Sequence, residues 1–532
     1  MTAAVVAASH GLKVLVLEKT KYYGGTTAYS GGGAWIPNNK HQPAIGVEDS
    51  REQAETYLHH ILGDLYNAKK VESFLDSAPK MVDWLEKNSS VKFKPVPLPD
   101  YHIGTEGSNV GRTILTQEFD GRELGRLVKD LRYPLQGYSA FGSMQADPAE
   151  LGMLTNPFGN LKNFSHGTAR ITRYLVDLVR YGKGTELANG NALAGRLLHS
   201  AIQKNVDVWN ESPAIKPIVD SSRVAGLVVR KNGKDVSIGT RHGVVLASGG
   251  FGRSEEMKSY LPHEWSAQPR GNTGDGKRIG LESGGALGPV NPDNGIFAPI
   301  SLRTPKSGPV RRFPHFAIDR AKPGSIIVDT SGTRFANESQ PYQEFVRTMH
   351  EKKIDKAFFI ADSVFLKKYG MGMALPWPYP VGRLIREGYL ISAPSIPALA
   401  AKLEISPSTL EATVSACNEH ARTGVDTAFH RGENLYDTFY GDAGNKPNPS
   451  LGVCAKGPFY ALPLYPGNVS TIFGLQTDEH ARVVDGHGEV VQGLFAVGCD
   501  QNSVMRGTYP GGGSSIGPGM TFGYRAGLKL AS

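Results

Sequence analysis

Hydrophobic and polar positions follow two periods along this chain, and together they predict a mixed α/β protein. Short continuous apolar runs at residues 13–17 and 243–252 are typical of buried parallel strands, and the second run ends in glycines. Between residues 50 and 88, apolar positions recur at spacings of three and four, which predicts helix. Residues 1–10 are rich in alanine and predict another helix, with Gly11 as its C-cap.

Alternating segments in the middle of the chain predict an antiparallel meander attached to the first part. Its expected strands are residues 206–209, 224–230 and 235–238. Beyond residue 300 the chain becomes irregular and rich in proline. Other predicted elements are helices at 191–199, 272–284, 362–369 and 395–423, mixed helix and loop at 124–180, and strands at 325–329, 474–484 and 494–498.

This order of elements predicts an α/β fold with its cofactor domain in two sequence pieces. The first piece is residues 1–300 and the second is residues 473–532, a Rossmann-like arrangement. An inserted α+β domain at residues 301–472 is expected to carry the substrate site. A chain of 532 residues with 40% hydrophobic content is long enough for two such cores.

The glycine-rich run at residues 506–519 is the segment around which we expect the chain to be organised. Gly511, Gly512 and Gly513 lack Cβ atoms, so a flat ligand can approach their main-chain N–H groups. Those groups stand before a predicted helix at 520–526, where negative charge is favoured. We interpret the run as a cradle for the electron-accepting end of a flavin, with Tyr509 facing the substrate.

Two other interpretations of this run have to be weighed. It could be a flexible loop and nothing more. Residues 513–517 also match G-x-S-x-G, the nucleophile elbow of α/β hydrolases. That fold needs an acid and a histidine later in the chain, and none follows Ser515, so we reject the hydrolase.

A second cofactor signal lies near the N-terminus. Glu18 ends the predicted strand at 13–17, where a dinucleotide-binding unit places an acid that accepts hydrogen bonds from ribose hydroxyls. Lys19 and the glycine and hydroxyl loop at 24–33 follow, on the expected path of a pyrophosphate. Residues 272–276 (Asn-Thr-Gly-Asp-Gly) open another predicted helix and also suit a nucleotide, although a capped turn would look the same.

The usual start of such a unit, a first strand and a G-x-G-x-x-G turn, does not precede the helix at 1–10. The expected strand would be central in the sheet, and without it backbone groups would be unpaired. We therefore expect either that the natural chain starts upstream or that this form binds cofactor poorly. A truncated copy that binds nothing is the non-enzyme alternative.

Composition excludes several other classes. The net charge is +8, but Lys and Arg are dispersed without a long basic run, which argues against nucleic acid and is compatible with an anionic cofactor or a peripheral membrane contact. The three cysteines Cys417, Cys454 and Cys499 are far apart and fit neither a disulfide framework nor a metal site. No apolar run reaches the ~18 residues of a spanning helix. We expect a soluble cytoplasmic protein without a metal.

Nearly the whole sequence resembles the 3-ketosteroid Δ1-dehydrogenases, within the wider fumarate-reductase-like flavoprotein group. The resemblance is carried by motifs at residues 17–32, 272–276, 334–342, 429–433 and 506–513. It implies FAD as the cofactor. The FAD-binding candidates are Glu18, Lys19, Gly24, Gly25, Thr26, Thr27, Ser30, Gly31, Gly32, Gly249, Gly250, Asn272, Asp275, Gly276, Gly498, Ser515 and Ile516.

The resemblance also implies a reaction, the removal of hydrogens from C1 and C2 of a 3-keto A-ring in a steroid or steroid-like triterpenoid. Tyr509 and the Gly513 N–H match the family's two donors to the C3 oxygen, an oxyanion-hole arrangement. Tyr342 matches the base that takes the C2 proton, and Tyr101 matches its supporting tyrosine. The C1 hydride would pass to the flavin, and an external acceptor of unknown identity would reoxidise it.

Related activities remain as alternatives at this stage. A Δ4-type steroid dehydrogenase is close, because tyrosine placement separates ring positions poorly. A dicarboxylate reductase would need clustered Arg and His around a dianion, and only Arg506 stands in the glycine run. For the apolar substrate we expect a pocket lined by residues such as Phe119, Phe297, Phe316 and Trp377.

Overall fold

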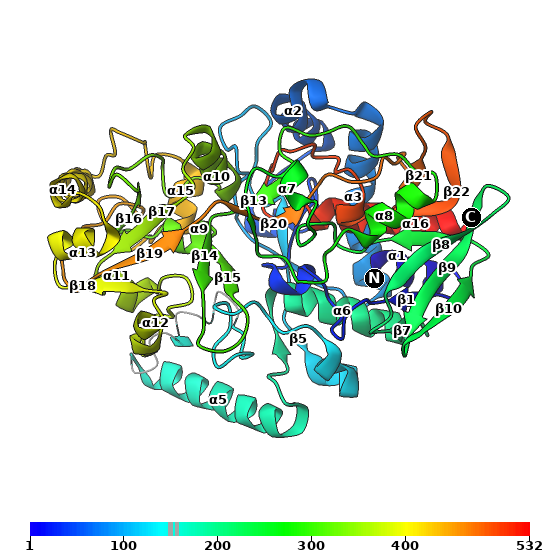
Figure 1. Ribbon diagram of the computed structural model, residues 1–532, viewed down its shortest axis with the longest axis horizontal. Helices are drawn as coiled ribbons and strands as arrows, with labels where there is room; N and C mark the ends of the chain where they lie inside the picture. The colour runs from blue at the N-terminus through cyan, green and yellow to red at the C-terminus, as the bar shows by residue number, and fades with distance from the viewer. Residues whose placement is uncertain (147–149, 151–152, 155–158) are drawn as a thin grey trace.

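A computed structural model describes residues 1–146, 150, 153–154 and 159–532 of the chain, arranged as helices intermixed with several sheets (Figure 1). Both termini lie at the same end of the molecule (Figure 1). Helix α1 (Thr2–Ser9) packs there against the last helix, α16 (Ile516–Ala531). The close approach depends on Gly527, where an added Cβ would lie 2.7 Å from Val6 Cβ.

The predicted N-terminal strand forms as β1 (Leu15–Leu17), but its partner differs from the prediction. It pairs in parallel with β7 (Asp207–Trp209), a segment that the sequence pattern predicts in the meander. Val206 and Val208 pack with the buried side of α1, which holds β7 beside β1 instead. The meander consists of β8 (Ala214–Asp220), β9 (Arg223–Lys231) and β10 (Lys234–Gly239). β8 escaped prediction because it contains a proline and its register shifts twice, so it shows no regular alternation.

Strands from opposite ends of the chain share one sheet. β11 (Val244–Leu246) pairs in parallel with β22 (Val490–Ala496), and β21 (Arg482–Val484) adds to β22 antiparallel. β22 also bridges to the meander at one position, so the sheet joins both pieces of the predicted cofactor domain. The described residues place β1 and β11 in separate sheets, and both border one large cavity. β1 is therefore only half-buried, which corrects the prediction of a fully buried strand.

The C-terminal helix begins earlier than the sequence indicates. α16 starts at Ile516 instead of residue 520, because the Gly517 N–H already donates to the Gly513 carbonyl at 2.8 Å. The predicted helical region 50–88 forms as α2 (Arg51–Leu62) and α3 (Ala68–Asn88), separated by the short turn η3 (Gly63–Leu65).

Residues beyond 300 build a second sheet at the opposite end of the molecule (Figure 1). Its antiparallel strand order is β16 (Ser325–Asp329), β17 (Ala357–Ala361), β19 (Phe459–Leu464) and β18 (Ile391–Ala393). Successive residues point to opposite faces: Phe359 belongs to one buried cluster, whereas Phe358 and Ile360 belong to another. α13 (Ile396–Leu403) and α14 (Pro407–Thr423) cover the second face.

Shorter elements connect these cores. Where an irregular chain was expected after residue 300, β14 (Ile300–Arg303) and β15 (Arg311–Pro314) form a hairpin. Part of the predicted mixed region 124–180 lies outside the described residues; the rest includes η4 (Gly121–Asp130) and α5 (Leu161–Tyr181). The other elements are η1 (Thr27–Tyr29), β2 (Gly33–Trp35), η2 (Gln42–Ile45), β3 (Phe93–Pro95), β4 (Thr113–Thr116), β5 (Phe119–Asp120), β6 (Glu186–Leu187), α6 (Asn189–Gln203), α7 (Met257–Tyr260), β12 (Trp265–Ser266), α8 (Asp275–Glu282), β13 (Gly295–Phe297), α9 (Ala317–Arg320), α10 (Tyr342–Glu351), α11 (Ser363–Tyr369), α12 (Gly382–Arg386), α15 (Leu435–Tyr440), β20 (Gly467–Thr471) and η5 (Gly498–Asp500).

Candidate active site

Three tyrosines that are far apart in the sequence meet in one buried cluster. Tyr101 lies in the loop after β3, Tyr342 is the first residue of α10, and Tyr509 lies in the loop before α16. The ring centroids of Tyr101 and Tyr342 are 5.6 Å apart, and those of Tyr342 and Tyr509 are 5.5 Å apart. Each side chain is at most 7% exposed, so the phenols face one another and not bulk water.

The hydroxyl groups of the cluster are close enough to share protons and to converge on one ligand atom. Tyr101 Oη donates to Tyr342 Oη at 3.3 Å. The Gly513 N–H donates to Tyr509 Oη, also at 3.3 Å. Two donors at this separation can both reach a single oxygen placed between them, which is the geometry that an oxyanion requires.

Burial raises the pKa of all three phenols. The pKa of Tyr342 and that of Tyr101 lie well above their usual value, and the pKa of Tyr509 is also raised, because burial disfavours the phenolate in each case. The phenols are therefore neutral donors at pH 7. For Tyr342 to act as a base its pKa must be lowered, and the hydrogen bond that it accepts from Tyr101 lowers this pKa.

Two further tyrosines join the cluster and were not found from the sequence. Tyr436, on α15, is 1% exposed and its ring lies 4.9 Å from that of Tyr101, edge to face. Tyr440, one turn later on α15, packs against Tyr436 at 5.2 Å and borders the cavity. α15 follows the motif at 429–433 closely, but nothing in its own residue pattern indicates a site.

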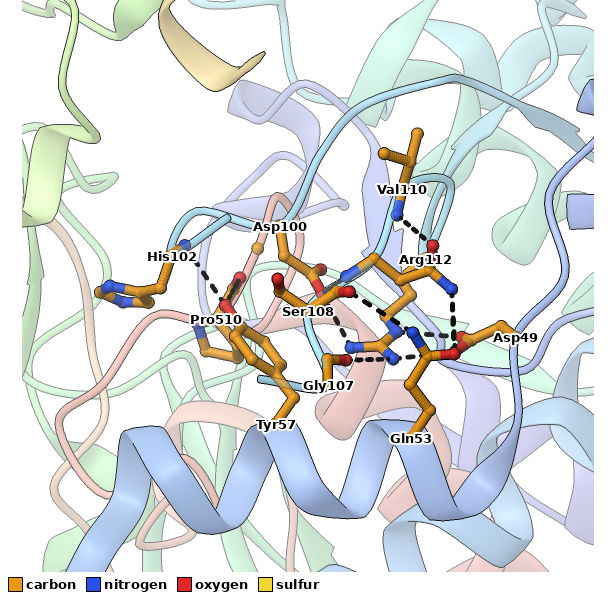
Figure 2. Close-up of polar contacts among 12 residues, drawn as sticks. Asp49, Gln53, Tyr57, Asp100, His102, Gly107, Ser108, Val110, Arg112 and Pro510 are labelled. Carbon is orange, nitrogen blue, oxygen red and sulfur yellow. Dashed lines mark hydrogen bonds and ion pairs between the residues drawn. The ribbon is translucent and has the colours of Figure 1, made fainter. Parts of the chain in front are cut away.

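A buried ionic network holds the segment that carries Tyr101 (Figure 2). The Arg112 guanidinium is fully buried and donates to Asp100 at 2.8 Å and to Asp49 at 2.8 Å. Trp35 Nε1 donates to the other oxygen of Asp100 at 2.8 Å. Burial raises the pKa of Asp100 to about 6, although Arg112 opposes that rise. Because Asp100 immediately precedes Tyr101, this network fixes the backbone from which the phenol projects.

A second contact ties the Tyr101 loop to the Tyr509 loop (Figure 2). Tyr57 Oη donates to the Pro510 carbonyl at 2.8 Å and accepts from the His102 N–H at 3.3 Å. The Tyr101 N–H donates to the same Pro510 carbonyl at 2.9 Å. The two loops are thus joined directly beside the tyrosine cluster.

One cavity of about 2580 Å³ connects the tyrosine cluster to the glycine segments. This exceeds the roughly 300–1,000 Å³ of an ordinary small-ligand site, so a dinucleotide and a substrate fit together. Its lining includes Tyr101, Tyr342, Tyr509 and Gly513, and also Glu18, Lys19, Gly24, Gly25, Thr26, Thr27, Ser30, Gly31, Gly32, Gly249, Asn272, Asp275, Gly276, Gly498, Ser515 and Ile516.

Some predicted residues do not border the cavity. Gly250 faces away from it, and a Cβ there would collide with the Thr471 hydroxyl. Phe119 and Phe297 are packed inside separate hydrophobic clusters, so they are not pocket residues. Trp377 is half-exposed, and its neighbours in the chain border the cavity instead. Of the four aromatic residues expected in the pocket, Phe316 does line it.

Hydrogen bonds link the distant cofactor segments to one another. Lys19 Nζ pairs with Asp275 Oδ2 at 2.7 Å, which joins the end of β1 to the start of α8. Asn272 Nδ2 donates to Thr26 Oγ1 and to the Gly249 carbonyl, both at 2.8 Å. These bonds draw three separate loops into a single wall of the cavity.

The glycines of this wall suit a bound dinucleotide. A Cβ added to Gly25, Gly31 or Gly498 would meet no protein atom within 4 Å, although all three residues border the cavity. The free space above their backbone is where a ligand can approach main-chain N–H groups. Ser515, the N-cap of α16, also borders the cavity, which directs the positive end of that helix dipole toward it. The residues present therefore fit FAD.

Within the part of the chain that the structure describes, no group of His, Cys, Asp and Glu side chains could hold a metal ion. No helix there is long and apolar enough to cross a membrane. The three cysteines are free thiols. A glycine-walled dinucleotide cavity that opens onto neutral phenols is the architecture of a flavin-dependent oxidoreductase.

Comparison with known proteins places the chain within that class. A family model described as "FAD binding domain" matches residues 1–516. The chain is 37% identical to a 4-oxocyclohex-2-ene-1-carboxylate 5-dehydrogenase of Sinomonas cyclohexanicum, covering 100% of this chain and 92% of that protein. It is 35% identical to a 3-oxosteroid 1-dehydrogenase of Mycolicibacterium smegmatis, covering 100% and 95%. The crystal structure of a 3-ketosteroid Δ1-dehydrogenase from Sterolibacterium denitrificans, in complex with 1,4-androstadiene-3,17-dione, superposes with a TM-score of 0.90 at 34% identity, covering 100% and 97%.

The chain belongs to the family of FAD-binding flavoproteins that includes these dehydrogenases. FAD is its cofactor, and its reaction is a dehydrogenation of a CH–CH unit.

Proposed function

We propose that this enzyme introduces a double bond between C1 and C2 of the A-ring of a 3-keto steroid or steroid-like triterpenoid. The observation that carries the proposal is the meeting of Tyr101, Tyr342 and Tyr509 with the Gly513 N–H at one end of a large cavity. A relative that is 35% identical over the whole chain is a 3-oxosteroid 1-dehydrogenase, which supports the same substrate class.

In this proposal the two donors of the Tyr509 loop act on the ketone. The C3 oxygen takes the position between Tyr509 Oη and the Gly513 N–H, and both donate to it, so that the Gly513 N–H no longer donates to Tyr509 Oη. Hydrogen bonding at that oxygen acidifies the neighbouring C2–H, because charge that develops on the enolate is stabilised.

Tyr342 acts in its phenolate form, after losing its own proton to solvent, and accepts the C2 proton to become a neutral phenol. Its oxygen lies 3.3 Å from Tyr101 Oη, and the hydrogen bond that Tyr101 donates stabilises the phenolate before the transfer. Bound FAD supplies the hydride acceptor for the C1 hydrogen. Glycine and hydroxyl loops on β1, β11 and α16 would hold it, with Glu18 toward the ribose. An external electron acceptor completes the cycle.

We also propose the domain division that the sequence indicates, with residues 1–300 and 473–532 around FAD and residues 301–472 over the substrate. The sheet that joins β11 to β22 supports the union of the two cofactor pieces. The three free cysteines support a reducing compartment such as the cytoplasm.

A monocyclic 4-oxo acid is the second candidate substrate. The relative at 37% identity acts on a cyclohexene carboxylate. A carboxylate needs a cation, and Lys322 and Lys368 both border the cavity. Burial lowers the pKa of Lys322, so a substrate carboxylate beside it would stabilise the protonated ammonium group.

The test is turnover of the FAD-loaded protein with an artificial electron acceptor and two ketones. A 4-ene-3-keto steroid should be converted to the 1,4-diene, identified by its mass loss of two hydrogens and by the position of the new double bond. 4-Oxocyclohexanecarboxylate should react at least tenfold more slowly, measured as kcat/KM. A higher kcat/KM for the monocyclic acid would make it the proposed substrate in place of the steroid. If neither ketone reacts, both proposed substrates are wrong.

Single variants separate the roles of the tyrosines. Tyr342→Phe should lower turnover at least 100-fold with flavin absorbance unchanged. Tyr509→Phe should slow exchange of the substrate's C2 hydrogen with solvent. Tyr389→Phe is the matched control, since Tyr389 is equally buried but bonds to Ser301 outside the cluster. Normal turnover by Tyr342→Phe would contradict its role as base.

A further inference from the structure

The two tyrosines that we propose to act on neighbouring atoms of the ketone come from different segments of the chain. Tyr342 begins α10 (Tyr342–Glu351), whereas Tyr509 lies in the loop before α16. Their ring centroids are 5.5 Å apart. A catalytic group that is displaced by about 1 Å can lower a rate by roughly 100-fold. The contacts that join α10 to the Tyr509 loop therefore decide whether both phenols reach one substrate.

The carboxylate of Asp293 is held by two side chains of α10. Asp293 is 9% exposed and lies in the loop before β13. Gln343 Nε2 donates to Asp293 Oδ2 at 2.8 Å. Arg347 donates to the same oxygen from Nε at 3.1 Å and from Nη2 at 2.5 Å. Asp293 is therefore attached to the helix whose first residue is Tyr342.

The Tyr509 loop contacts both members of the Asp293–Arg347 ion pair. Gly507, two residues before Tyr509, has a φ of +95°, and an added Cβ would lie 2.9 Å from the Asp293 carbonyl oxygen and 3.0 Å from its nitrogen. The two backbones thus touch at a position that favours glycine. Arg347 Nη2 also donates to the Gly507 carbonyl at 3.3 Å. One guanidinium group therefore joins α10, Asp293 and the Tyr509 loop.

The planar fork of the Arg347 guanidinium allows this double contact. Its Nη2 is within hydrogen-bond distance of both the Asp293 carboxylate and the Gly507 carbonyl. Its Nη1 pairs with Glu344, three residues earlier on α10, at 2.8 Å. The side chains of that second pair are 33% and 27% exposed, so it contributes little to stability. The Asp293 side chain is only 11% exposed, so loss of its pair with Arg347 leaves a buried charge without its cation.

Helix α10 does not depend on Arg347 for its fold. Its apolar side carries Phe345, Val346 and Met349, which are fully buried in one hydrophobic cluster. Neither Arg347 nor Asp293 borders the cavity, so a substitution at either residue leaves the side chains that would contact FAD and the ketone unchanged. Such a substitution therefore acts on the reaction through the position of the phenols.

We propose that Arg347 and Asp293 are positioning residues that set the separation between Tyr342 and Tyr509. Asp293 fixes the guanidinium against α10. The guanidinium and the Asp293 backbone together fix Gly507, so the phenol two residues later is held at a constant distance from α10. The kinetic consequence of this arrangement rests on the proposed dehydrogenation, whereas the placement of the two phenols does not.

Crystal structures of the FAD-loaded wild type and of Arg347→Met test this placement without any turnover. Methionine keeps an unbranched stem and removes the guanidinium. We expect the separation of the Tyr342 and Tyr509 ring centroids, 5.5 Å in the wild type, to change by about 1 Å or more. Asp293→Asn, which keeps an oxygen acceptor and removes the charge, gives the same comparison if Arg347→Met does not fold. Phenols that stay in place in the folded variant would overturn the proposal.

Steady-state turnover with the 4-ene-3-keto steroid tests the consequence. Arg347→Met should lower kcat by about tenfold or more and slow exchange of the C2 hydrogen by a similar factor, while KM stays within about threefold because the cavity wall is unchanged. Arg347→Lys keeps the charge but not the fork, so its kcat should lie between those of the wild type and Arg347→Met. Glu344→Gln is the matched control. It removes the partly exposed pair of Arg347 and leaves the contact with Asp293, so its kcat should stay within about twofold of the wild type.

The pH dependence of kcat/KM separates positioning from a loss of stability. Burial and the neighbouring Tyr509 raise the pKa of Tyr342, so a shifted Tyr509 should displace the profile. A variant that is only less stable keeps the wild-type profile. If the wild type converts the steroid and Arg347→Met keeps the full kcat and the same profile, the inference is wrong and the proposed function stands. If the wild type converts neither ketone, the proposed function is wrong, and the crystal structures still decide the placement of the phenols.

Discussion

The hydroxyl group of Tyr57 can be used to test whether its hydrogen bonds position the loops that carry Tyr101 and Tyr509. Tyr57 is fully buried on α2, and its hydroxyl bonds to Pro510 and to His102 (Figure 2). Pro510 follows Tyr509 and His102 follows Tyr101 along the chain, so both partners adjoin tyrosines that we propose to act in the reaction. Tyr57→Phe removes this hydroxyl and keeps the ring, so packing with Trp35 is preserved.

The magnitude follows from the two bonds that are lost. The Pro510 carbonyl keeps its bond from the Tyr101 N–H, whereas the His102 N–H loses the acceptor it has in the wild type. At about 0.5–1.5 kcal/mol for each bond, the free energy of unfolding should fall by about 1–3 kcal/mol. Misplacement of a catalytic group by about 1 Å can lower a rate by roughly 100-fold, so we expect kcat to fall by about 10- to 100-fold.

The assay is steady-state turnover together with flavin content and a denaturant melt. Tyr66→Phe is the matched control, because Tyr66 follows α2, is only partly buried, and bonds to Glu55 at 3.0 Å, away from the cavity. It should leave kcat within about twofold. A Tyr57→Phe variant that loses stability but keeps its full kcat would refute the positioning role. The hydroxyl would then serve the fold alone.

Three further changes test the site. Gly513→Ala places a Cβ against the Gly33 carbonyl at a φ of +92°, so we expect a loss of about 1–3 kcal/mol in a denaturant melt and weaker FAD binding. Because burial raises the pKa of Tyr342, kcat/KM should rise with pH between 7 and 10, up to tenfold per unit; a flat profile would contradict a phenolate base. The raised pKa of Tyr342 also makes its neutral phenol stabilise the folded protein. This contribution is fully present below the unfolded-state pKa of about 10 and is lost as pH rises through the higher folded-state pKa. Asn272→Ala removes bonds to Thr26 and to a loop carbonyl, so the FAD dissociation constant, followed by flavin absorbance, should rise about tenfold.

Part of the site could be predicted from the sequence, because it depends on the backbone conformation of a few consecutive residues. A glycine run before a helix favours close approach to the backbone, and Gly513 does have a positive φ with a backbone oxygen where its Cβ would stand. Glu18, at the end of a short apolar strand, likewise lies on the cavity. Because such features are local, they can be predicted without knowledge of the fold.

Contacts between distant segments could not be obtained in that way. The sequence placed β7 in the meander, but Val206 and Val208 pack against α1 and take the strand to β1. Tyr436 joins the phenol cluster only because α15 happens to fold back beside Tyr101. The periodicity of either segment does not specify its partner. A hydrophobic period shows which residues are buried, but it does not show which other segment covers them.

The sequence by itself indicated elements such as β1, β11, α2 and α3, although it missed β8, β14 and β15, and it indicated most of the glycines that border the cavity and the phenols that were proposed to react. Only the tertiary structure decided that Tyr101 and Tyr342, 241 residues apart, bring their hydroxyls within 3.3 Å. It also decided that α5 turns apolar side chains such as Leu175 and Val179 outward, because ion pairs of Arg173 on the opposite side of the helix hold it there. The physical reason is the same in both cases: side-chain convergence is set by the packing of whole segments, which no single segment encodes.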